Sequence, residues 1–101
     1  MLGMLEQIKA DVEKHPIILY MKGSKLMPMC GFSAQVVEIL FSLGVPFETR
    51  NVLEDDQLRS SIKEFSNWPT LPQLYIKGEF IGGCDVVTEL FESGQLQKMV
   101  T

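Results

Sequence analysis

The sequence predicts a single α/β domain over residues 1–101, with a small mixed sheet between helices. A chain of 101 residues has about the size of one domain, and no linker, repeat or low-complexity segment divides it. Hydrophobic patterns indicate the order helix, strand, helix, strand, helix, strand, strand, helix. A helix separates the first two strands, which favours a parallel pair, whereas the last two form a hairpin. The sheet is therefore expected to be mixed.

The first predicted helix has apolar residues at helical spacing and ends near His15-Pro16. Its expected core-facing residues are Leu5, Ile8 and Val12. Residues 17–21 are continuously apolar, which predicts a strand buried on both faces. A loop containing Gly23, Ser24 and Pro28 follows over residues 22–29.

The second predicted helix follows this loop and ends near Gly44, a residue typical of helix C-termini. Its expected apolar face consists of Val36, Val37, Leu40 and Phe41. Residues 46–52 predict a less hydrophobic strand nearer the edge of the sheet. The third helix follows the acidic run 54–56, since carboxylates favour the positive end of a helix dipole. Its expected core residues are Leu58, Ile62 and Phe65.

Residues 73–76 and 79–81 predict two strands joined by a tight turn at Lys77-Gly78. Gly82-Gly83 ends this hairpin, and the last helix is expected to begin at Asp85. Its apolar residues are Val86, Val87, Leu90 and Phe91. Gly94 interrupts the pattern, and residues 95–99 predict one last helical turn.

Composition excludes several classes of protein. The net charge of −4 argues against nucleic-acid binding, which needs a basic surface. No apolar run approaches the ~18 residues of a membrane span, so no membrane association is expected. The N-terminal residues 1–14 resemble neither a secretory signal nor a transit peptide. We expect a bacterial-type cytoplasmic location, or an organelle if the chain is a trimmed precursor.

Two cysteines in 101 residues indicate a reducing compartment and not a disulfide scaffold. Their spacing fits no zinc pattern, and the only histidine is His15. The informative motif is Cys30-Gly31-Phe32-Ser33, which puts one thiol at the start of a helix. A serine stands where a dithiol site has its second cysteine, so Cys30 cannot close a disulfide within the motif. Its partner must be a small thiol, a protein thiol or a metal.

Four segments together resemble the monothiol glutaredoxins of the Cys-Gly-Phe-Ser type. Besides the cysteine motif, they are Lys22-Gly23, Trp68-Pro69-Thr70-Leu71-Pro72-Gln73 and Gly82-Gly83-Cys84-Asp85. The resemblance extends over residues 5–100. It implies a thioredoxin-like fold with a four-stranded mixed sheet flanked by helices. It also implies glutathione binding and a 2Fe–2S cluster that two chains share and pass to apo iron–sulfur client proteins. A small BolA-type protein is a further implied partner, replacing one half of the dimer.

The resemblance assigns Cys30 as the reactive thiol and as the iron ligand. Lys22 and Arg59 become candidates for binding the glycyl carboxylate of glutathione. The alternative for both is an ordinary solvated surface charge. Ser33 either caps the helix or matters only because it replaces a second thiol.

Leu71-Pro72 resembles the family's cis-proline loop, whose backbone pairs with the cysteinyl part of glutathione. Pro69 is expected to be trans. Cys84-Asp85 opens the last helix, where backbone N–H groups can bind the γ-glutamyl carboxylate. Asp85 either caps that helix, pairs with the ammonium of glutathione, or does both. Cys84 is a buried apolar residue at rest, or a second thiol able to pair with Cys30 on oxidation.

Ligand counting gives two arrangements for the cluster. A 2Fe–2S cluster needs four ligands, and one chain has two cysteines. Either each of two chains contributes Cys30 and a bound glutathione, or each contributes Cys30 and Cys84. The resemblance favours glutathione, and both arrangements require a homodimer.

Two functions follow from these observations, and a third interpretation stays open. The first is glutathione-dependent binding and transfer of a 2Fe–2S cluster. The second is a thiol–disulfide oxidoreductase that removes glutathione from protein mixed disulfides, expected to be weak at most. The third is a thioredoxin-like interaction module in which the thiol has no role.

Overall fold

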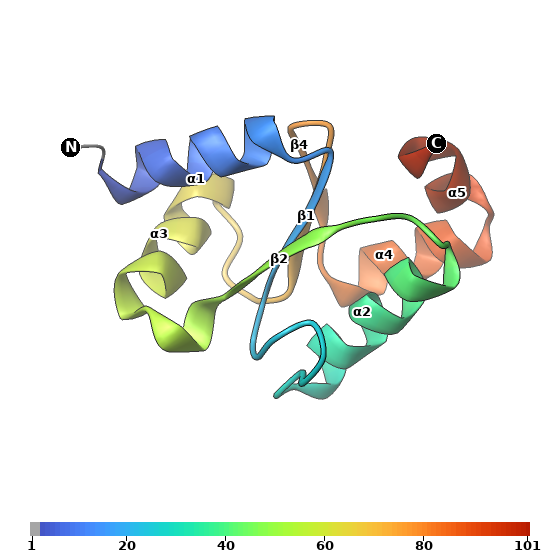
Figure 1. Ribbon diagram of the computed structural model, residues 1–101, viewed down its shortest axis with the longest axis horizontal. Helices are drawn as coiled ribbons and strands as arrows, with labels where there is room; N and C mark the ends of the chain where they lie inside the picture. The colour runs from blue at the N-terminus through green and yellow to red at the C-terminus, as the bar shows by residue number, and fades with distance from the viewer. Residues whose placement is uncertain (1–2) are drawn as a thin grey trace.

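The computed structural model describes residues 3–101 and has a sheet between two layers of helices (Figure 1). The helices are α1 (Met4–Lys14), α2 (Gly31–Ser42), α3 (Asp56–Ser66), α4 (Cys84–Glu92) and α5 (Gln95–Val100), with a short 3-10 helix η1 (Val52–Glu54). The strands are β1 (Ile17–Met21), β2 (Glu48–Asn51), β3 (Gln73–Ile76) and β4 (Glu79–Gly82). The predicted order of elements is confirmed. No described helix is long and apolar enough to cross a bilayer.

The four strands form one mixed sheet in the order β2-β1-β3-β4. β1 pairs in parallel with β2 and antiparallel with β3, and β3 pairs antiparallel with β4. β2 therefore lies at an edge, as its lower hydrophobicity predicted. The hairpin turn has both Lys77 and Gly78 at positive φ, 52° and 83°, the backbone that a two-residue turn requires.

β1 is buried along its whole length and separates two hydrophobic clusters. Because strand side chains alternate between faces, Ile17, Leu19 and Met21 face one cluster with α2, α4 and α5. Ile18 and Tyr20 face the other cluster, against α1 and α3. Figure 1 shows the same division, with α1 and α3 on one side of the sheet and α2 and α4 on the other.

Three details of the predicted elements are wrong. Leu5 of α1 is 39% exposed and Phe41 of α2 is 51% exposed, so neither belongs to the buried core. Phe41 instead packs from outside against the buried ring of Phe47, with ring centroids 5.1 Å apart. The last helix begins at Cys84 and not at Asp85, because its N-cap is Gly83.

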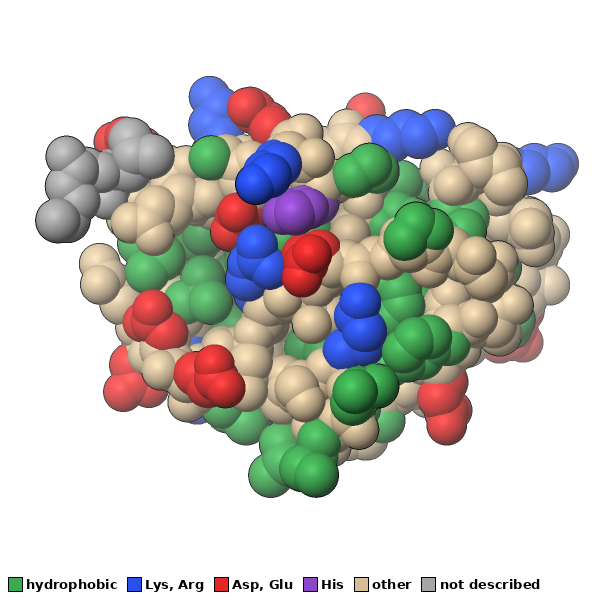
Figure 2. Space-filling model, viewed as in Figure 1, with side chains coloured by type: hydrophobic (Ala, Val, Ile, Leu, Met, Phe, Trp, Pro, Cys, Tyr) green, Lys and Arg blue, Asp and Glu red, His purple; other side chains and the backbone are tan. Residues whose placement is uncertain are grey.

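The side of the sheet covered by α1 carries a cluster of opposite charges at the exposed edge of β2. Arg50 pairs with Asp11 at 3.2 Å and with Glu48 at 3.4 Å, and it also contacts the ring of His15. Figure 2 shows the histidine, in purple, between side chains of both charges. The charges at this edge of the sheet thus pair with one another.

Truncation of the core should cost far more stability than truncation of the loop. Leu40 of α2 is fully buried, whereas Leu26 is 88% exposed. We expect Leu40→Ala to lower the free energy of unfolding by about 2–5 kcal/mol, because it removes packing and leaves a cavity. Leu26→Ala should change it by about 0.5 kcal/mol or less. Denaturant titration measures both, and equal midpoints would contradict this division of the structure.

Candidate functional site

The Cys30 thiol lies at the N-terminus of α2. Cys30 is the N-cap residue, with extended backbone angles, and its carbonyl oxygen accepts the Ala34 N–H at 2.9 Å. The Ser33 backbone N–H lowers the pKa of the thiol most, and the Phe32 N–H and the Lys22 charge lower it further. Partial burial opposes this effect without overcoming it. Helix-terminal N–H groups thus stabilise the thiolate, as the position of the motif predicted.

Ser33 does not cap the helix, and that interpretation is wrong. It is fully buried, three residues into the first turn, and its Oγ accepts the backbone N–H of Lys22 at 3.2 Å. The hydroxyl therefore joins the first turn of α2 to the residue that follows β1. Sequence reasoning missed this role because it requires a contact across 11 residues.

The loop from β1 to Cys30 folds back as a compact hairpin. The Met29 N–H donates to the Lys22 carbonyl at 2.9 Å, and the Gly23 N–H donates to Asn51 Oδ1 at 3.0 Å. Gly23 has φ 97°, and a Cβ there would lie 2.6 Å from the Met27 carbonyl oxygen. Only glycine fits this position, which explains the Lys22-Gly23 pair.

The loop before β3 forms a second wall of the site. The Leu71-Pro72 bond is cis, as expected, and it is the only cis bond within residues 3–101, so Pro69 is trans. The Leu71 side chain is anchored in the core beside α1 and α3. No hydrogen bond in the described part of the chain uses the Leu71 main chain, which leaves its polar groups free to pair with a ligand. Trp68 packs on Phe80 but stays 42% exposed.

Gln73 holds this loop in place, a role that sequence reasoning missed. Its buried side chain donates from Nε2 to the carbonyl oxygens of Trp68, at 3.1 Å, and Thr70, at 3.2 Å. The Tyr75 hydroxyl donates to Gln73 Oε1 at 3.1 Å. Burial raises the pKa of Tyr75 to about 12, so this hydroxyl remains a donor at neutral pH. A polar amide opening an apolar strand is the signal that could have revealed it.

The N-terminus of α4 forms a third wall. Gly83 is its N-cap residue and approaches the proline loop closely, because a Cβ there would lie 3.2 Å from the Pro72 carbonyl oxygen. Asp85 is exposed in the first helical turn. No side chain caps this helix, so the expectation that Asp85 is an N-cap is wrong. Its carboxylate is therefore not engaged in capping.

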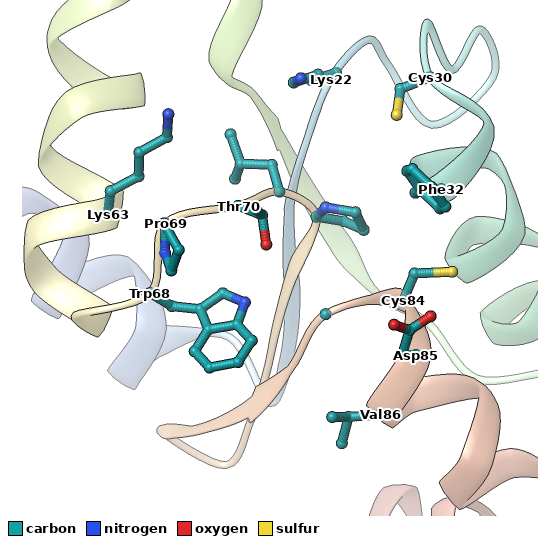
Figure 3. Close-up of a pocket in the computed structure, with 13 residues that line it drawn as sticks. Lys22, Cys30, Phe32, Lys63, Trp68, Pro69, Thr70, Cys84, Asp85 and Val86 are labelled. Atoms are coloured by element: carbon teal, nitrogen blue, oxygen red, sulfur yellow. The ribbon is translucent and has the colours of Figure 1, made fainter.

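The three walls enclose a pocket of about 420 Å³ (Figure 3). Six of the predicted site residues line it: Lys22, Cys30, Leu71, Pro72, Cys84 and Asp85. Figure 3 shows Lys22 and Lys63 toward one side, with the Cys30 sulfur and the Asp85 carboxylate toward the other.

Arg59 is the one predicted site residue that does not line the pocket. It is half-buried on α3 and lies one helical turn before Lys63, which does line the pocket and which sequence reasoning missed. Residues four apart share a helix face, so the two cations point to the same side of α3. The role of Arg59 stays a prediction.

Cys84 and Cys30 are both free thiols of intermediate exposure. Cys84 packs partly against the core beside α2 and also lines the pocket, so it is only partly the buried residue expected. Within residues 3–101 no group of three metal-binding side chains exists.

Comparisons with known proteins identify the family of this chain. The family model Glutaredoxin matches residues 17–81, and the chain therefore belongs to the glutaredoxin family. An uncharacterized monothiol glutaredoxin ycf64-like of Synechocystis is 55% identical over 89 residues, covering 88% of this chain and 83% of that protein. Chloroplastic monothiol glutaredoxin-S14 of Arabidopsis thaliana is 54% identical, covering 97% of this chain and 59% of that longer protein. Because Ser33 stands where a dithiol site has its second cysteine, the chain is of the monothiol type.

Solved structures confirm the thioredoxin-like fold. Reduced poplar apo GrxS14 superposes with a TM-score of 0.85 at 51% identity, covering 97% of this chain and 90% of that one. A buckwheat glutaredoxin–glutathione complex superposes with a TM-score of 0.85 at 25% identity, covering 96% and 86%. The predicted family and fold are both confirmed.

The thiolate should survive the loss of its nearest cation. We expect Lys22→Gln to raise the pKa of Cys30 but to leave it below the ordinary thiol value, because the Ser33 N–H contributes more. Thiolate reacts faster than thiol, so the pH midpoint of alkylation moves upward without reaching that of a free cysteine. Mass-resolved iodoacetamide kinetics measure it at Cys30, with Lys9→Gln as control. A midpoint unchanged by Lys22→Gln, or one at the free value, contradicts the assignment.

Proposed function

We propose that this chain binds a 2Fe–2S cluster together with glutathione and passes it to apo-proteins. The observation that carries the proposal is the single activated thiol, Cys30, facing a pocket with Ser33 where a second thiol would resolve it. Thiolate is the usual ligand of such clusters. The cluster is the cargo of the protein, and a reducing compartment such as the cytoplasm would keep this thiol available.

Glutathione fits the pocket by size and charge. A cavity of about 420 Å³ lies in the range of small-molecule sites. Lys22 and Lys63 offer cations for the glycyl carboxylate, and the Leu71 main chain offers an edge for the cysteinyl part. The N-terminus of α4 suits the γ-glutamyl carboxylate, with Asp85 for the ammonium. The buckwheat relative, whose structure is a glutathione complex, supports this use of the fold.

A second copy of the chain completes the ligand set. Two Cys30 thiolates and two glutathione thiolates make four ligands. The exposed apolar side chains around the thiol favour a protein partner there, since large apolar groups on a surface indicate contact sites. They are Leu26, Met27, Met29 and Phe32, with exposures of 88%, 68%, 65% and 63%. A BolA-type protein would occupy the same face as the second copy.

The second candidate function uses the same thiol and pocket. The lowered pKa of Cys30 favours attack on the glutathione sulfur of a mixed disulfide, which releases the client thiol. A second glutathione thiolate then attacks that sulfur, forming glutathione disulfide and restoring the Cys30 thiolate. A coupled reductase assay with a glutathionylated protein tests it, and rates at background would reject it as the main function.

Substitution of the two cysteines separates the two ligand sets. Anaerobic reconstitution with iron, sulfide and glutathione should give a coloured dimer, detected by visible absorption and native mass. We expect Cys30→Ser to abolish both signals and Cys84→Ser to retain them. If Cys84→Ser loses both signals and the unmodified protein assembles the cluster without glutathione, the ligand set of four cysteines would be favoured. An iron-loaded dimer of Cys30→Ser formed without glutathione would refute the proposal.

The cations on α3 should contribute to glutathione binding. We expect Arg59→Gln and Lys63→Gln each to raise the dissociation constant about threefold to tenfold, because each removes one partner of a carboxylate at a partly exposed site. NMR titration of the reduced protein with glutathione measures it. Lys9→Gln on α1 is the control, since that exposed residue lies outside the pocket. Unchanged affinity in both α3 variants would contradict this orientation of the ligand.

A further inference from the structure

A groove between α2 and α4 extends the thiol pocket along the surface. Two hollows of about 370 and 380 Å³ lie along this groove, and both are lined by Gln35, Thr88 and Glu92. The first hollow also shares Phe32, Cys84 and Asp85 with the thiol pocket. A hydrogen bond of 2.8 Å from Gln35 Nε2 to Thr88 Oγ1 bridges the two helices. The groove is therefore continuous with the reactive site.

The groove has the length of a short extended peptide. On α2 its lining runs from Phe32 to Ser42, which corresponds to about 15 Å along a helix. An extended chain rises about 3.3 Å per residue, so about four or five residues would span it. Phe32, 63% exposed, and Phe91, 37% exposed, supply apolar contacts toward its two ends.

Carboxylates line the groove, and no basic side chain within residues 3–101 lines it with them. Its exposed carboxylates are those of Glu38, Asp85, Glu89 and Glu92. The sequences of α2 and α4 contain no lysine, arginine or histidine. Both ion pairs found within residues 3–101 belong to Arg50, so none of these carboxylates is paired there. An approaching chain thus meets negative charge in the groove, whereas the cations Lys22 and Lys63 line the adjoining thiol pocket.

We propose that this groove docks a basic, extended segment of the client protein. The inference rests on the proposed function, because that function is what gives this chain a client protein. Charge complementarity selects this occupant, since like charges across an interface are costly. A second copy that met this groove with its own groove would set unpaired carboxylates against one another. A metal ion is not the favoured occupant, since among residues 3–101 no group of three side chains is placed to hold one.

Thiol–disulfide exchange at Cys30 tests the groove without any cluster. The probes are two synthetic peptides with one cysteine, flanked by lysines in one and by glutamates in the other. Each peptide carries thionitrobenzoate on its cysteine as a mixed disulfide. The Cys30 thiolate attacks the peptide sulfur, forms a new disulfide with it and expels the thionitrobenzoate anion, which is coloured. All protein variants carry Cys84→Ser, so that Cys30 is the one attacking thiol.

We expect the lysine peptide to react about tenfold faster than the glutamate peptide at low ionic strength. Glu89→Lys with Glu92→Lys should abolish this preference. Glu6→Lys with Glu13→Lys on α1 makes the same change in net charge outside the groove and should preserve it. Neutral dithiodipyridine, reacting equally with all variants, shows that the thiolate is intact.

Equal rates with the two peptides would overturn the proposal. So would a preference that survives in the groove variant, or one that disappears in both double variants and so reflects net charge alone. Cluster assembly is measured separately, by the reconstitution above. A protein that assembles the cluster but shows no peptide preference refutes the groove alone, whereas the opposite result refutes cluster carriage alone.

Discussion

The burial of β1 on both faces is the constraint on which the rest of the structure depends. Five consecutive apolar residues, 17–21, pack alternately into two hydrophobic clusters, so the strand has no freedom to slip by one residue. Its end is thereby fixed in space, and the next N–H, that of Lys22, donates to the Ser33 hydroxyl. This contact sets the first turn of α2 against the end of the strand. The position of the Cys30 sulfur is thus a consequence of core packing.

The chemistry of the thiol depends mainly on the backbone. The largest effect on the pKa of Cys30 comes from the Ser33 N–H, which substitutions other than proline leave in place. Side chains instead shape what the thiolate meets: Gln73 fixes the proline loop, and Gly83 lets the start of α4 approach that loop. Activation and recognition are therefore separable, and substitutions in the walls should change the partner more than the reactivity of the sulfur.

The sequence was sufficient wherever a local pattern determines the structure. A continuous apolar run predicted β1, hydrophobic patterns predicted the order of the elements, and Lys77-Gly78 predicted the hairpin turn. The cis bond before Pro72 came from resemblance to a family. What it could not supply was the contact across space. Ser33 looked like a cap because local rules favour serine there, yet its partner is the backbone after β1. Likewise, the register of α3 against the proline loop decides that Lys63, and not Arg59, lines the pocket.

The net charge of −4 does not describe how the charged side chains are distributed around the site. The cations Lys22 and Lys63 line the thiol pocket, and the carboxylates of α2 and α4 line the groove that continues from it. Glutathione would span the pocket, with its glycyl carboxylate at the cations and its γ-glutamyl carboxylate at the start of α4, whereas a basic chain suits the groove. A glutathione in the pocket and a client chain in the groove would then have the same thiol as their neighbour, so that exchange of a thiol or of a cluster between them would pass through Cys30.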